Sequence, residues 1–111
     1  MEITLVTRDV DGYSVVEVSG EVDVYTAPQL DEQLSTLVEG GSYKLIVDLS
    51  AVEFLDSTGL GVLVKALKRV REHDGSLAVI TATDRISKVF RITGLDTAIS
   101  LHSSVDEAVA G

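Results

Sequence analysis

The sequence predicts an α/β domain in which a mixed β-sheet, opened by an N-terminal β-hairpin, carries about four packed helices. Three observations support this class. Two strand-like segments, residues 2–8 and 13–19, flank Asp11-Gly12, a dipeptide that tolerates the positive φ angles of a tight hairpin turn. Two later segments, 45–47 and 77–80, are continuously apolar, as in strands covered on both faces. Helical periodicity separates these segments, so we expect most parallel strands to be joined by right-handed crossovers.

The second strand of the hairpin is predicted to bend at Gly20 and to end at Tyr25, because alternation of apolar and acidic residues is interrupted only at the glycine. Residues 26–29 (Thr-Ala-Pro-Gln) fit a capping box with Pro28 in the first helical turn. Apolar residues at helical spacing follow, and Gly40-Gly41 should end this helix.

The remaining elements alternate between strand and helix. In order, we predict a strand over 44–49, a helix over 57–73 closed by Gly75, a strand over 77–80, a helix over 84–93 ended by Gly94, a strand over 98–101 and a last helix capped by Ser104 with Glu107.

Length and composition limit the possible classes of protein. The 111 residues suffice for one domain, predicted to span residues 1–111. The absence of cysteine excludes a disulfide framework, a thiolate metal site and a cysteine nucleophile. No apolar run approaches the ~20 residues of a membrane span, and the start of the chain does not resemble a signal peptide. We therefore expect a cytoplasmic protein with no membrane partner.

The net charge of −9 is unevenly distributed. Residues 1–56 carry twelve acids against two bases, whereas residues 57–111 carry seven bases against six acids. Nucleic acid is not expected as a partner, because neutralising phosphates requires a basic surface. The acidic half serves solubility, or it forms a face that attracts a basic protein surface.

The segment Asp56-Ser57-Thr58 lies after the 44–49 strand, at the carboxyl end of a central parallel strand, where open α/β sheets place their sites. The simplest interpretation is a helix N-cap. However, three capping-type residues stand where one suffices, and Gly59 and Gly61 each cost a helix up to ~1 kcal/mol relative to alanine. This suggests close approach by a phosphate, a docking partner or a neighbouring helix.

A phosphoryl group on Ser57 would benefit from the helix dipole and the first N–H groups. It would add about −1.5 to −2 charges beside Asp56, and near Asp23 if the fold brings those loop ends together. Such a modification changes what can dock while leaving the fold intact.

The sequence gives little support for catalysis. Leu55 and Gly59 flank Ser57 where a serine hydrolase elbow needs two glycines, and Gly59-Leu60-Gly61 lacks the remaining residues of a nucleotide-binding loop. His73 and His102 are expected to be surface histidines rather than catalytic bases. No catalytic residue is predicted.

Other charged residues also receive structural interpretations. Asp48, Glu53 and Asp56 could suggest a hard-metal site, but we expect Asp48 to end a strand and Asp56 to cap a helix. No metal or cofactor is predicted. The basic residues of the helix after Ser57 are expected to form a solvated face that complements the helix dipole. They are Lys65, Lys68, Arg69 and Arg71.

Four segments together resemble the anti-sigma factor antagonists, the stand-alone bacterial members of the STAS domain family. They are Gly20-Glu21-Val22-Asp23, Val47-Asp48-Leu49-Ser50, the run from Val52 to Leu63, and Phe90-Arg91-Ile92-Thr93-Gly94-Leu95. The resemblance runs from about residue 2 to residue 109 and looks closest to actinobacterial antagonists. Its most specific part is Asp-Ser-Thr-Gly-Leu-Gly, at residues 56–61. The resemblance implies a STAS fold and a transcription regulator that acts by partner switching.

By this resemblance, Ser57 matches the serine phosphorylated by a partner anti-sigma factor that is also a serine kinase with a GHKL-type ATP site. The unphosphorylated antagonist binds this kinase and frees the sigma factor that the kinase held. Phosphorylation ejects the antagonist, and a metal-dependent serine phosphatase resets it. Asp23 and Asp56 match acidic positions that border the phosphoacceptor, and Thr58 matches a variable Ser/Thr position. The further candidates for partner contact, on the same surface, are Glu21, Thr58, Gly59 and Gly61.

Two alternatives remain within the family. The chain could be a STAS subunit of a transport or lipid-trafficking assembly, or a nucleotide-binding STAS module that uses the same loop.

Overall fold

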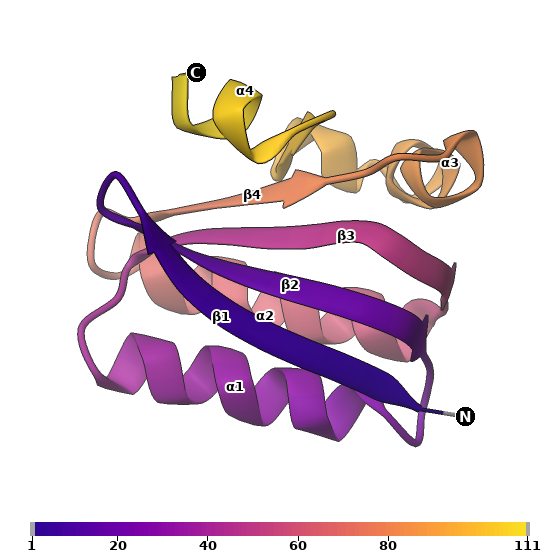
Figure 1. The fold of residues 1–111 in the computed structure, drawn as a ribbon, viewed down its shortest axis with the longest axis horizontal. Coiled ribbons are helices and arrows are strands. Elements are labelled where there is room, and N and C mark those ends of the chain that lie inside the picture. Colours follow the sequence, from indigo (N-terminus) through magenta and orange to yellow (C-terminus); the bar gives the residue numbers. More distant parts are fainter. Residues whose placement is uncertain (1, 111) are drawn as a thin grey trace.

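Five strands form one mixed sheet in the computed structural model, which describes residues 2–110 (Figure 1). The order across the sheet is β1-β2-β3-β4-β5, with β1 antiparallel to β2 and every other neighbouring pair parallel. The strands are β1 (Ile3–Val10), β2 (Tyr13–Val22), β3 (Lys44–Leu55), β4 (Ser76–Ile80) and β5 (Ser100–His102). The hairpin turns at Asp11 and Gly12, whose φ angles are +50° and +87°.

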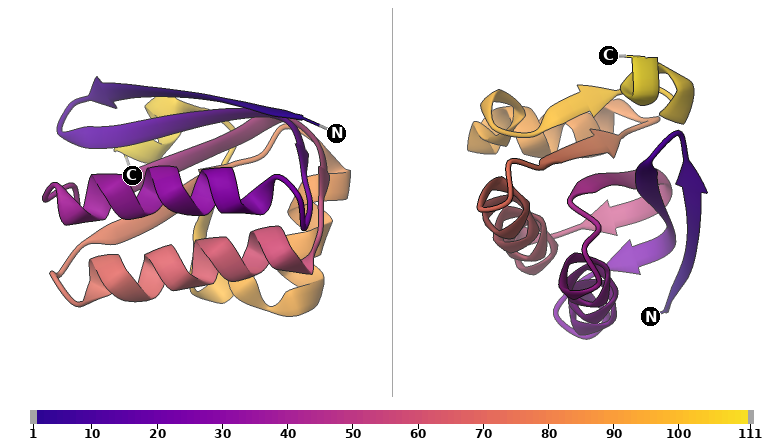
Figure 2. Two further views of the ribbon diagram at one scale, coloured as in Figure 1. Left: turned by 90° about the horizontal axis from the view of Figure 1, so that it is seen from below. Right: turned by 90° about the vertical axis from the view of Figure 1, so that its left-hand side faces the viewer.

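Two long helices, α1 (Ala27–Glu39) and α2 (Ser57–Arg71), lie side by side beneath one face of the sheet (Figures 1 and 2). The helices α3 (Asp84–Thr93) and α4 (Val105–Ala110) lie on the other side of β4, and the 3₁₀ turn Leu95–Thr97 leads into β5. The predicted α/β class, a mixed sheet opened by a hairpin and covered by four α-helices, is confirmed.

A main core fills the space between the sheet and the two long helices, and α3 contributes Ile86 and Phe90 to it. A smaller cluster beneath α4 consists of Val15, Ile46, Ile80 and Ala108. Leu45 and Val47 face the main core and Ile46 faces the smaller one, so the central strand is covered on both faces. This double burial explains the continuous apolar run in the sequence.

The second strand bends at Gly20, as predicted, but ends at Val22 rather than at Tyr25. Gly20 has a φ of +104°, and the register with β3 shifts beside it. A side chain at this position would overlap the Glu2 carbonyl oxygen, so the bulge needs glycine.

The predicted capping box at the start of α1 is wrong. The Thr26 hydroxyl makes no bond to the first turn of α1. It donates to the Glu21 carbonyl at 2.7 Å and accepts from the Asp23 N–H at 2.9 Å. Those groups belong to the bulged end of β2 and the turn that follows it, and they occupy the hydroxyl in place of the helical N–H groups. Pro28 occupies the first turn, as predicted.

The central strand β3 continues to Leu55, six residues beyond the predicted end. Val52 and Leu55 are buried in the main core, and this burial extends the strand along β2. Asp48 therefore lies within the strand and does not end it as predicted.

Smaller differences lie elsewhere. The helix α2 ends at Arg71, two residues early, and β5 covers 100–102 instead of 98–101. The ends of α3 agree with the prediction, and the Ser104 hydroxyl accepts the Glu107 N–H at 3.1 Å. Among the residues that the structure describes, no helix combines the length and apolarity that crossing a membrane requires.

Candidate functional site

The turn after β2 and the start of α2 lie next to each other at one end of the sheet. Val22 and Leu55, the last residues of β2 and β3, are register partners. The Asp56 N–H donates to the Val22 carbonyl at 3.2 Å, which fixes the beginning of α2 beside residues 23–26. The fold therefore brings together the two segments that carry Asp23 and Ser57.

The carboxylate of Asp56 alone caps α2. Its Oδ1 accepts the Thr58 N–H at 2.9 Å and the Gly59 N–H at 3.1 Å, and its backbone is extended, as at a helix N-cap. The side chains of Ser57 and Thr58 are exposed and make no hydrogen bond to any residue between 2 and 110. The sequence did not decide which of these residues caps the helix. In the structure Asp56 is the cap, and the Ser57 hydroxyl is free of hydrogen bonds to the described residues.

The two glycines of α2 differ in their surroundings. Gly59 is buried, and a Cβ there would lie 2.6 Å from Leu55 Cδ1 and 2.7 Å from Val22 Cγ1. The close approach at Gly59 is therefore internal, between the helix and the ends of β2 and β3. Gly61 is exposed, and a Cβ there would meet nothing within 4 Å. The fold gives Gly61 no packing role, although glycine at this position weakens the helix.

Asp23 is a buried support for the turn, with only 7% of its surface exposed. Its Oδ1 accepts the Tyr25 N–H at 2.9 Å, the Thr26 N–H at 3.0 Å and the Thr26 hydroxyl at 3.3 Å. Burial raises the pKa of the Asp23 carboxyl, but the hydrogen bonds from Thr26 and Tyr25 outweigh it and hold the pKa below the usual aspartate value. Asp23 therefore shapes the turn and exposes little of its carboxylate.

Three exposed apolar residues at this site were not predicted from the sequence. Tyr25 is 84% exposed, Val24 58% and Phe54 44%, and we call these three residues the apolar rim. Phe54 pairs in register with Glu21, which is half-buried, one residue before the Val22–Leu55 pair. One signal was available: Val24-Tyr25 places two large apolar residues directly after Asp23 and shortly before Pro28, where the polar residues of a turn are usual.

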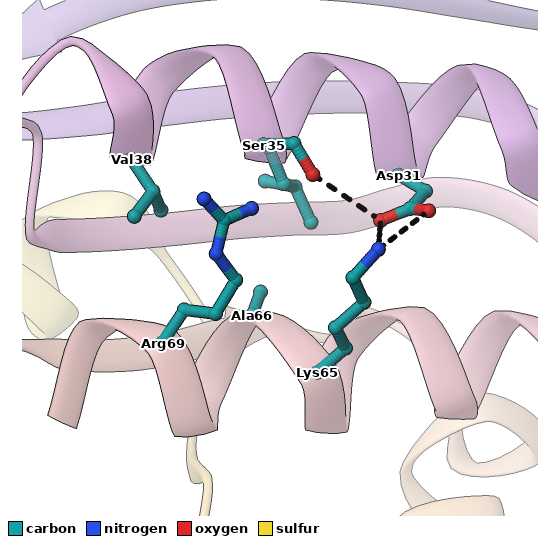
Figure 3. Close-up of a pocket in the computed structure, with 7 residues that line it drawn as sticks. Asp31, Ser35, Val38, Lys65, Ala66 and Arg69 are labelled. Atoms are coloured by element: carbon teal, nitrogen blue, oxygen red, sulfur yellow. Dashed lines mark hydrogen bonds and ion pairs between the residues drawn. The ribbon is translucent and has the colours of Figure 1, made fainter. Parts of the chain in front are cut away.

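The hollow between α1 and α2 is bridged by an ion pair and leaves no room for a water molecule (Figure 3). The Lys65 ammonium contacts both Asp31 carboxylate oxygens at 3.1 Å, and Arg69 approaches Glu39 at 3.8 Å. Arg71 donates to the Ala98 carbonyl at 3.2 Å. Lys65 and Arg71 are exposed, as predicted for a solvated face, whereas Arg69 is partly buried. All three also link α2 to neighbouring segments, which was not predicted.

The two histidines also differ from each other. His73 is exposed, as predicted, and stacks on Tyr43 with ring centroids 4.0 Å apart. The His102 side chain is only 19% exposed and lies 3.4 Å from a Glu107 oxygen, so the prediction of a surface histidine is wrong there.

No group of three or more potential metal ligands gathers within residues 2–110.

Comparison with known proteins connects this geometry to one family. The family model described as "STAS domain" matches residues 4–108. An anti-sigma-B factor antagonist of Staphylococcus aureus is 36% identical over 106 residues, which cover 96% of this chain and 98% of that protein.

Solved structures show the same similarity. An anti-sigma factor antagonist from Mycobacterium paratuberculosis has a TM-score of 0.91 and 37% identity, covering 98% of this chain and 92% of that one. The Bacillus cell fate determinant SpoIIAA in its phosphorylated form has a TM-score of 0.75 at 21% identity, covering 96% and 97%. This second likeness concerns the fold alone.

Proposed function

The chain belongs to the STAS domain family, and on this premise we propose that it is an anti-sigma factor antagonist switched by phosphorylation of Ser57. In its unmodified form it binds an anti-sigma factor that is also a serine kinase. Binding releases the sigma factor that the kinase had held. The chain itself binds partners and is not an enzyme.

The observation that carries this proposal is the exposed Ser57 hydroxyl beside a helix cap that does not use it. A kinase needs an accessible hydroxyl on a rigid platform. The Asp56 cap and the tight packing at Gly59 hold the first turn of α2 in place without Ser57. The acceptor can therefore be modified without loss of a structural contact.

The surroundings of Ser57 suit a protein partner. The apolar rim of Val24, Tyr25 and Phe54 offers burial of exposed apolar surface, and exposed aromatic side chains are typical anchors of protein interfaces. Gly61 and Thr58 are small and exposed, so a partner can approach the first turns of α2 closely. Glu21 borders this surface through its register partner Phe54, and Asp23 contributes by shaping the turn that presents Tyr25.

The modification transfers one phosphoryl group. Ser57 Oγ attacks the γ-phosphorus of ATP held by the partner, the bond from that phosphorus to the β–γ bridging oxygen breaks, and ADP leaves. The hydroxyl proton passes to a base on the kinase. The phosphoserine adds about −1.5 to −2 charges.

The sequence led us to expect that the first N–H groups of α2 would stabilise a phosphate on Ser57, but two of these groups, those of Thr58 and Gly59, are already bonded to Asp56. Because Asp56 occupies these N–H groups, they do not neutralise the phosphate, and much of its negative charge faces the bound partner. A charge left unpaired in a close interface costs several kcal/mol, which is enough to eject the partner. A metal-dependent serine phosphatase then hydrolyses the phosphoserine and restores the binding form.

The test is to mix the chain with its anti-sigma factor and Mg-ATP and to follow the intact mass and complex formation. We expect one phosphoryl group, located at Ser57, and dissociation of the complex. Ser57→Ala should stay unmodified and bound, and Ser57→Asp should lose binding. In the neighbouring Thr58→Ala variant, Ser57 should be phosphorylated as it is in the wild type. A complex that forms without modification of Ser57 would exclude the switch.

A further inference from the structure

The central strand extends well beyond its neighbour β4. The register between them runs only from Lys44–Ser76 to Asp48–Ile80, whereas β3 continues for seven more residues, 49–55 (Figure 1). On the other side, β2 remains paired with β3 as far as Leu55. The register with β4 stops at the Asp48–Ile80 pair, and no register pair joins β4 to residues 49–55. At the start of this stretch the Ser50 N–H donates to the Asp48 carboxylate at 2.9 Å, so the free main-chain groups lie beyond it. This part of β3 therefore has an unpaired edge, which we call the β3 edge.

An open groove of about 690 Å³ follows the β3 edge. Ser50, Ala51, Val52 and Glu53 line one wall, and Thr83 and Arg85 line the other. Consecutive residues of a strand point to opposite faces of a sheet. The register with β2 shifts within this stretch, so the alternation is not strict here. Four consecutive residues of β3 nevertheless line the groove opposite Thr83 and Arg85, which places it along the side of β3 that faces the start of α3.

We propose that the β3 edge binds an extended segment of the anti-sigma factor that docks at Ser57, and this inference rests on the proposed function above. Unpaired main-chain N–H and C=O groups along a strand are a template for pairing with another strand. The edge is also continuous with the proposed interface, since β3 runs from the groove into Phe54 of the apolar rim and then to Asp56 and Ser57. The four groove residues span about 13 Å at ~3.3 Å per residue, which accommodates about four residues of a partner strand.

The charged residues of the groove favour a bound segment that carries a carboxylate opposite Arg85. Arg85 is exposed and has no ion pair or hydrogen bond among the described residues, in a chain whose net charge is −9. A carboxylate on the bound segment that faces Arg85 would form a charge-assisted pair. Glu53, also exposed, stands on the opposite wall and disfavours an acidic residue there, so the two walls together select the register of the segment.

Hydrogen–deuterium exchange of the full chain, alone and in complex with its anti-sigma factor and a non-hydrolysable ATP analogue, tests the strand pairing. We expect amide exchange over residues 49–55 to slow in the complex, in addition to protection around Ser57. A matched pair of variants tests the charge preference. Arg85→Glu should weaken binding by roughly tenfold, as loss of a close interfacial charge pair does, whereas Lys88→Glu should change it by less than about twofold.

Lys88 is a suitable control because it is exposed on the same helix, also lacks a partner among the described residues, and does not line the groove. Arg85→Glu should not unfold the helix, since an acidic residue in the first turn complements the dipole. A complex that forms and phosphorylates Ser57, but leaves exchange over 49–55 unchanged, overturns this inference alone. Equal effects of the two variants also overturn it. Failure to form any complex overturns both this inference and the proposed function.

Discussion

Alanine substitution at the two glycines of α2 should change stability in opposite directions. At Gly61 a Cβ meets nothing within 4 Å, so Gly61→Ala gains only the helix propensity of alanine, about 0.5–1 kcal/mol. At Gly59 the new Cβ would lie 2.7 Å from Cγ1 of Val22, a β-branched side chain with few alternative rotamers. Overpacking of this kind costs about 1–3 kcal/mol, which exceeds the propensity gain of up to ~1 kcal/mol. Gly59→Ala should therefore destabilise the fold, by up to about 2 kcal/mol.

Urea unfolding followed by far-UV circular dichroism measures both changes, and equal m-values would show that the comparison is valid. The stabilised Gly61→Ala variant should nevertheless bind the anti-sigma factor more weakly than the wild type, because its methyl group projects into the surface where we propose that the partner docks. A loss of stability at Gly61, or a gain at Gly59, would refute the packing argument. Unchanged affinity in Gly61→Ala would remove Gly61 from the docking surface while leaving the stability argument intact.

Three further predictions concern the same end of the sheet. Tyr25→Ala should weaken binding of the anti-sigma factor by about 2 kcal/mol in calorimetry, as loss of an aromatic anchor does, whereas Ile92→Ala, which truncates a 73% exposed residue on α3, should not. Asp56→Ala should lower the free energy of unfolding by about 0.5–2 kcal/mol through loss of the cap, while Ser57→Ala should leave it nearly unchanged; equal losses would contradict the assignment of the cap. The lowered pKa of Asp23 means that its contribution to stability is present above the ordinary aspartate pKa and disappears as the pH falls through the lower value of the folded state. Asp23→Asn should therefore lower the melting temperature near neutral pH and differ less from the wild type in strong acid; a constant difference across this range would argue against the hydrogen-bonded carboxylate.

Features set by local sequence were predictable. Asp11-Gly12 determines the hairpin because its residues adopt the positive φ angles that the turn needs. Features that depend on distant contacts were not. The extension of β3 depends on burial of Val52 and Leu55 in the main core, and the strand pattern alone does not contain that information. The Thr26 hydroxyl bonds to groups exposed by the bulge at Gly20, so a motif that reads as a capping box forms another structure.

The candidate site shows the same division. The sequence located Ser57 and its neighbours, but three polar residues could each have capped the helix, and only the backbone geometry assigns the cap to Asp56. The apolar rim was missed for a related reason. Alternation over residues 16–24 placed Val24 on the apolar face of a strand, whereas the strand ends at Val22 and leaves Val24 and Tyr25 in an exposed turn.

The start of α2 separates the residues that stabilise the fold from those that are available to a partner. Asp56 caps the helix and Gly59 lets it approach β2 and β3, and both are engaged inside the molecule. Ser57 and Gly61 lie on the same turns of helix, are exposed and support no contact of the fold. A charge added at Ser57 can therefore alter binding by several kcal/mol at an interface while leaving the free energy of unfolding almost unchanged. A switch that depended on unfolding would need the Ser57 hydroxyl to be structural, and this hydroxyl makes no hydrogen bond to the rest of the described chain.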